Sequence, residues 1–124
     1  MDTREITDWL GDAAADLTAE QIERVAAESR RIDERYPDPD EQGERDAALS
    51  AVVQHLLGET TPEEAARTLI DARAAERRAY AAALQHAVMV VGDNVQAGRP
   101  PQKATAARLA GVDRMSLLKA LGER

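Results

Sequence analysis

The sequence predicts an all-α protein in which an amino-terminal helical bundle is linked by a long helix to a carboxy-terminal three-helix unit. The first supporting observation is composition. Of the 124 residues, 25 are Ala and only 23 are Leu, Val or Ile, and the chain has neither Phe nor Cys. Ala, Leu, Glu, Arg and Gln are strong helix formers, so strand-rich folds and disulfide scaffolds are excluded. The second observation is that apolar residues recur at three- and four-residue steps between proline and glycine breakers.

Two helices are predicted before Pro37. The first spans about residues 3–16, and its apolar positions share helical spacing: Ile6, Trp9, Leu10, Ala13 and Leu17. We expect Trp9 to anchor the core. Thr18 and Gln21 form a capping box that opens the second helix. The run Pro37-Asp38-Pro39-Asp40 ends it, because a proline disfavours helical geometry in the residue before it.

A third helix and a long fourth stretch follow. The third is expected from about Asp40 or Glu41 to Leu57, with Gly58 as its stop. Thr61-Pro62-Glu63-Glu64 then reads as a capped helix start with proline in the first turn. One long helix, or two end to end, continues from there. The residues that recur at three- and four-residue steps along it change from polar to apolar near Tyr80: Ile70, Arg73, Arg77, Tyr80, Leu84, Ala87, Val91 and Asn94. Arg99-Pro100-Pro101 is the next boundary, and two short helices follow it.

Charge is distributed unevenly along the chain. The net charge is −7, but residues 1–97 carry −11 and residues 98–124 carry +4. A basic end on an acidic chain is typical of a polyanion-binding segment.

The stretch Ala104–Leu121 has the layout of a helix-turn-helix. Gly111 can adopt the positive φ that ends one helix and turns the chain, and Asp113 can cap the next helix. Ala107 leaves room for two helices to cross closely. The six positions with structural roles are Ala107, Gly111, Val112, Asp113, Leu117 and Leu121.

This pattern resembles the helix-turn-helix of phage repressors and Cro-like proteins. The run from Ala110 to Ser116 is similar to small regulators of GC-rich bacteria, and the resemblance covers about Leu84–Leu121. It implies that helix 114–121 enters the major groove of double-stranded DNA. The base-contacting residues that it implies are Arg114, Met115, Ser116, Leu118 and Lys119. The phosphate-contacting residues that it implies are Arg99, Lys103, Arg108 and Arg124.

Three residues depart from the family pattern. Leu118 stands where a basic or polar residue is usual, Ala120 stands where tryptophan is frequent, and Leu109 occupies a position that often faces solvent. These departures keep a second interpretation open, in which a degenerate helix-turn-helix serves as a protein–protein interaction module. Its partner would be a protein such as a sigma factor, gripped through Leu109, Met115 and Leu118. A third class, a regulator that responds to a small molecule, needs a pocket for which the Ala-rich bundle leaves little room.

Other chemistries find little support in the sequence. The only histidines, His55 and His86, lack the spacing of a metal site, so no metal or other cofactor is expected. There is no Gly-rich phosphate loop, nucleophile elbow or HExxH motif, so an enzyme is not expected. No apolar run approaches the roughly 18 residues that span a bilayer, and the first residues lack the features of a signal peptide. We therefore expect a cytoplasmic protein without membrane contacts.

The sequence thus predicts two regions, an acidic helical bundle over residues 1–79 and a helix-turn-helix DNA-binding unit over residues 80–124. One such unit with roughly six basic contacts binds DNA weakly, so a homodimer that reads two half-sites about 34 Å apart is expected, with the bundle as its dimerisation region. The predicted function is sequence-specific DNA binding, as a transcriptional regulator or a plasmid or phage DNA-binding protein.

Overall fold

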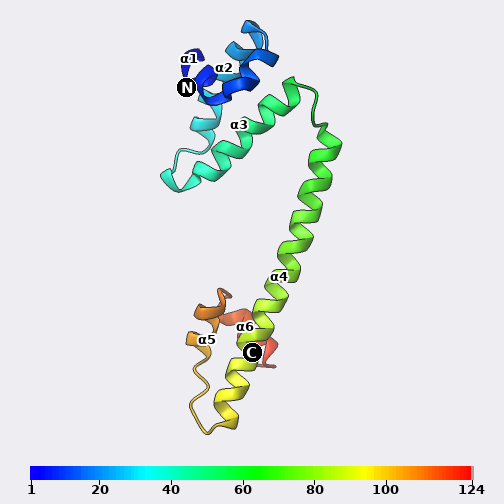
Figure 1. Ribbon diagram of the computed structural model, residues 1–124. Coiled ribbons are helices and arrows are strands. Elements are labelled where there is room, and N and C mark those ends of the chain that lie inside the picture. Colours follow the sequence, from blue (N-terminus) through cyan, green and yellow to red (C-terminus); the bar gives the residue numbers. More distant parts are fainter. Residues whose placement is uncertain (124) are drawn as a thin grey trace. The chain divides into compact units, whose positions relative to one another are not determined.

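The computed structural model describes residues 1–123, and over that range its regular structure is entirely helical (Figure 1). This confirms the all-α prediction. The chain divides into two compact units, Met1–Ala66 and Arg67–Arg124. The division falls near the start of the long helix α4 (Pro62–Gln96), whereas the sequence analysis placed the boundary after residue 79, within the same helix.

The first unit is built from three α-helices. They are α1 (Thr3–Leu10), α2 (Ala19–Arg35) and α3 (Gln42–Leu56), with short 3₁₀ helices at Gly11–Asp16 and Pro39–Glu41. α2 packs against both α1 and α3. The buried core of the first unit consists of Ile6, Leu17, Val25, Ala26, Ile32 and Leu49.

Local hydrogen bonds fix the ends of these helices. The predicted capping box at α2 is confirmed, since the Gln21 amide N–H donates to Thr18 Oγ1 at 3.1 Å and the Thr18 N–H donates to Gln21 Oε1 at 2.8 Å. The loop between α2 and α3 is held by Arg45, whose guanidinium donates to the carbonyl oxygens of Tyr36 and Asp38. The proline-rich break is therefore an ordered turn.

The first predicted helix ends earlier than expected. α1 stops at Leu10, where Gly11 adopts φ 58°, and the chain continues as a 3₁₀ helix to Asp16. This change of helical period breaks the apolar stripe. Ile6 and Leu17 stay in the core, but Trp9 is 42% exposed, so its predicted role as a core anchor is wrong.

α4 is one continuous helix of 35 residues, which decides between the two predicted alternatives. Its start follows the predicted signal, because the Glu64 amide N–H donates to Thr61 Oγ1 at 3.2 Å. From residue 67 to residue 82 nearly every side chain is exposed, and the first buried residue of α4 is Ala87.

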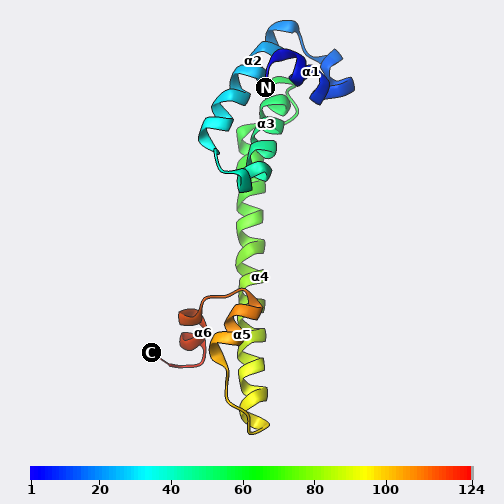
Figure 2. The ribbon, with the colours of Figure 1, turned by 90° about the vertical axis from the view of Figure 1, so that its left-hand side faces the viewer.

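The second unit combines α4 from residue 67 onward with α5 (Lys103–Ala110) and α6 (Arg114–Ala120). Both short helices lie beside the carboxy-terminal half of α4 (Figure 2). The buried core of this unit is Ala87, Val91, Ala106, Ala107, Val112 and Leu117. Three of the six are alanines, and such small side chains let helices without large apolar residues approach closely.

Candidate nucleic-acid interface

The net charges of the two structural units differ slightly more than those of residues 1–97 and 98–124. Residues 1–66 carry 6 basic and 18 acidic side chains, a net charge of −12, whereas residues 67–124 carry 10 basic and 5 acidic side chains, a net charge of +5. Compared with residues 98–124, the second unit also includes four arginines and three acidic residues of α4, which together add a net charge of +1. Most of the net positive charge of the second unit therefore lies in residues 98–124, which carry +4 of its +5.

The turn between α5 and α6 is closed by two backbone hydrogen bonds. The Val112 N–H donates to the Ala107 carbonyl at 3.0 Å and the Gly111 N–H donates to the Arg108 carbonyl at 3.2 Å, which is a Schellman motif. Gly111 has φ 73°, and a Cβ built there meets no atom within 4 Å. Glycine is required at this position by the left-handed backbone and not by lack of space.

Asp113 caps α6 through both carboxylate oxygens. Oδ1 accepts from the Ser116 N–H at 2.8 Å, while Oδ2 accepts from the Ser116 hydroxyl at 2.6 Å and from the Tyr80 hydroxyl at 3.1 Å. The hydrogen bonds from Ser116, with a further contribution from Tyr80, hold the pKa of the Asp113 carboxyl below its usual value. Tyr80 therefore ties α4 directly to the start of α6, a contact that the sequence analysis missed.

The outer surface of α6 presents most of the predicted base-contacting residues. Arg114, Met115 and Lys119 are exposed, Leu118 is half-buried, and Leu117 fills the core. Within residues 1–123 no carboxylate forms an ion pair with Arg114 or Lys119. Ser116 differs, because its hydroxyl donates to Asp113. Of the remaining structural positions, Ala107 and Val112 are buried and Leu121 packs against the same core.

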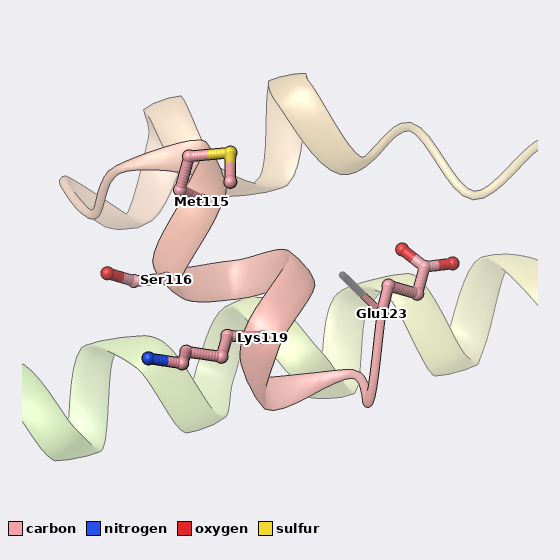
Figure 3. A pocket seen from close by; sticks show the side chains of 4 residues that line it. All are labelled: Met115, Ser116, Lys119 and Glu123. Carbon is pink, nitrogen blue, oxygen red and sulfur yellow. The ribbon is translucent and has the colours of Figure 1, made fainter.

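A shallow hollow of about 360 Å³ lies on this surface, lined by Met115, Ser116, Lys119 and Glu123. Figure 3 shows Ser116 and Lys119 projecting to one side of α6, with Glu123 on the other. The cationic group and the carboxylate are thus kept apart, and the Lys119 ammonium is turned outward.

The predicted phosphate-contacting residues differ in whether another side chain already binds them. Arg108 is exposed and has no ion-pair partner within residues 1–123. Arg99 donates through Nε to Asn94 Oδ1 at 3.3 Å, while Asn94 also holds the Pro101 carbonyl at 3.0 Å. Lys103 forms an ion pair with Glu123. Arg124 lies outside the described residues.

Two apolar side chains stand out beside these charges. Leu109 on α5 is 74% exposed and Met115 on α6 is 67% exposed. Neither packs against the core of its unit, so both are available to a partner molecule.

Among residues 1–123, no group of three or more His, Cys, Asp or Glu side chains is arranged to hold a metal ion. In the same range, no helix has both the length and the apolar character to cross a membrane. Comparison with known proteins finds no matching family model, curated protein or solved structure.

Proposed function

We propose that the protein is a sequence-specific DNA-binding protein that reads the major groove with α6, as a transcriptional regulator or a plasmid or phage DNA-binding protein. One observation carries this proposal. Arg114 and Lys119 are exposed on the outer surface of α6, without ion-pair partners in residues 1–123, on a unit of net charge +5. A short capped helix with free cationic side chains fits the chemistry of the groove.

Each exposed residue of α6 has a role that suits its chemistry. The Arg114 guanidinium can donate two hydrogen bonds to O6 and N7 of guanine, and Lys119 can reach a guanine or a phosphate. Met115 can contact a thymine methyl group. Because the Ser116 hydroxyl already donates to Asp113, it is left as an acceptor, which suits the exocyclic amines of adenine or cytosine. Leu118 is half-buried, so only part of its side chain can make an apolar contact with DNA.

Phosphate contacts would set the orientation of the unit on the duplex. Arg108 is available for this role without rearrangement. Lys103 would have to exchange the Glu123 carboxylate for a phosphate oxygen, and Arg99 would keep or exchange its hydrogen bond with Asn94. Arg124, outside the described residues, belongs to the same set by sequence.

A homodimer forms part of the proposal. One helix-turn-helix makes few contacts, and two copies that read half-sites about 34 Å apart gain both affinity and specificity. The acidic first unit would repel duplex DNA, which restricts contact to the basic unit. Light scattering at micromolar concentration should give twice the chain mass of 13.5 kDa, and a clean monomer would remove the dimer from the proposal.

The test is recovery of sheared genomic DNA by the purified protein, followed by sequencing. The wild type should enrich a defined set of sequences, and the double variant Arg114→Ala/Lys119→Ala should lose that enrichment. The matched control, Arg30→Ala/Arg35→Ala, removes the same charge from exposed positions of α2 in the acidic unit and should retain it. Equal, sequence-independent recovery by all three proteins would contradict the assignment of α6.

A second candidate function rests on the exposed side chains of Leu109 and Met115. With the half-buried Leu118, they could form the apolar contact of a protein–protein interaction module that binds a partner such as a sigma factor. Salt separates the two functions. If all six basic residues of residues 98–124 met phosphates, the logarithm of DNA affinity would fall with the logarithm of salt concentration at a slope of about −5 per protomer, whereas an apolar interface should respond little.

A further inference from the structure

The face of α4 that packs on α5 and α6 continues past them as a basic surface. Leu84, Ala87 and Val91 lie on the packed part of this face. One step toward the amino terminus, Tyr80 hydrogen-bonds the cap of α6. Arg77 and Arg73 come next. At about 100° per residue, both lie within about 50° of the direction in which the packed residues point.

These two arginines are free to bind an anion. Both are exposed, and no carboxylate in residues 1–123 forms an ion pair with either. With Glu76 and Tyr80 they line a shallow hollow on α4. The Tyr80 hydroxyl is already used by Asp113, so the cationic groups are the ones left to interact with a ligand.

The spacing of this pair suits a nucleic-acid backbone. At about 1.5 Å per residue, Arg77 and Arg73 lie roughly 4.5 and 10 Å along α4 from Tyr80. Tyr80 contacts the cap of α6, so the two arginines lie next to the start of that helix. They are about 6 Å apart along the axis of α4, so their long side chains can reach neighbouring phosphates of one DNA strand. In Figure 3, Lys119 projects toward the side on which the greener, earlier part of α4 lies.

We propose that Arg73 and Arg77 form a second phosphate-contacting site, which binds the DNA backbone beside the groove that α6 enters. This inference rests on the proposed function and extends it to a helix outside the helix-turn-helix stretch. Glu76, on the border of the site, opposes binding and limits its strength.

The helix offers a matched control. Arg67 and Arg78 are also exposed on α4, but they point about 130–150° away from the packed face. The variants Arg73→Ala/Arg77→Ala and Arg67→Ala/Arg78→Ala remove the same charge from the same helix, and alanine preserves its helical propensity. The probe is a fluorescein-labelled duplex of mixed sequence, because phosphate contacts do not depend on sequence. Its affinity is measured by anisotropy over a series of NaCl concentrations.

For Arg73→Ala/Arg77→Ala, we expect the slope of log affinity against log salt to become shallower by about 1.8, at roughly 0.9 per contact. The same relation gives a loss of affinity of roughly ten- to hundredfold at about 0.1 M salt. The control pair should change the slope by much less. Glu76→Gln should bind more tightly than wild type, since it removes the opposing charge.

Equal losses in the two double variants would overturn this inference, because they would show an effect of net charge without contact. Weaker binding by Glu76→Gln would overturn it as well. Failure of the proposed function gives a different result, in which the wild type binds no duplex or the Arg114→Ala/Lys119→Ala variant still recovers the same genomic sequences.

Discussion

The hydroxyl of Tyr80 donates to Oδ2 of Asp113 at 3.1 Å, across a sequence separation of 33 residues. This one contact joins the exposed part of α4 to the residue that caps α6. It therefore couples the proposed backbone-contacting arginines to the helix that is proposed to read bases.

The variant Tyr80→Phe removes only the hydroxyl. We expect the pKa of the Asp113 carboxyl to rise toward its usual value, because one of the hydrogen bonds that lower it is lost. A pH titration of the carboxyl carbon by NMR measures this directly. The control is Tyr36→Phe in the first unit, which should leave that pKa unchanged, and the same result for both variants would contradict the described contact.

The cap of α6 should depend on pH. The pKa of Asp113 is lower in the folded protein than in the unfolded chain, so the contribution of its charge to stability is complete above the unfolded value of about 4 and disappears as the pH falls through the lower folded value. Asp113→Ala should therefore lower the thermal midpoint most near neutral pH and by a smaller amount in acid, where only the charge-dependent part of the cap is lost. Asp113→Asn should keep much of the cap at every pH, since Asn is also a strong N-cap residue. A deficit of Asp113→Ala that persists unchanged in acid would contradict this account.

Two glycine substitutions should act in opposite directions. Gly111→Ala forces a side chain into the left-handed conformation at φ 73° and should destabilise the protein by roughly 1–2 kcal/mol. Gly43→Ala lies within α3, where alanine is favoured, and should stabilise by about 0.5–1 kcal/mol. Neither added Cβ meets an atom within 4 Å, so the two variants differ in backbone conformation and not in steric clashes. Urea unfolding measures both, and shifts of the same sign would show that backbone conformation does not explain Gly111.

Two leucines of the second unit test the core. Leu117 has no exposed surface, so Leu117→Ala should cost about 2–5 kcal/mol of unfolding free energy. Leu109 is 74% exposed, and Leu109→Ala should stay within about 0.5 kcal/mol of wild type. The same unfolding experiment compares them, and similar losses would place both residues in a core.

Features that depend on neighbours along the chain were predictable from the sequence. The cap signals at Thr18 and Thr61 each act over three residues, and both helices begin directly after these residues. Asp113 and Ser116 have the same separation, and the sequence proposed Asp113 as the cap that it forms in the structure.

Features that depend on distant residues were not predictable. Lys103 was expected to be free for phosphate, but Glu123 reaches it from 20 residues away. Tyr80 and Asp113 carry no local signal of their contact. The exposure of Trp9 has a different cause. Within α1, Trp9 lies about 60° around the helix from the buried Ile6, while Leu10 lies about 40° to the other side and packs against the core, so Trp9 is at the edge of the apolar face.

The central claim is that α6 reads bases, and the most direct test is a ratio of affinities. For each protein, the dissociation constant for a scrambled duplex is divided by that for a sequence enriched from genomic DNA, both at one salt concentration. We predict that Arg114→Ala lowers this ratio roughly five- to hundredfold, since a bidentate contact to guanine contributes about 1–3 kcal/mol of discrimination. A ratio that is unchanged while both affinities fall equally would contradict the claim, because Arg114 would then contact only the backbone.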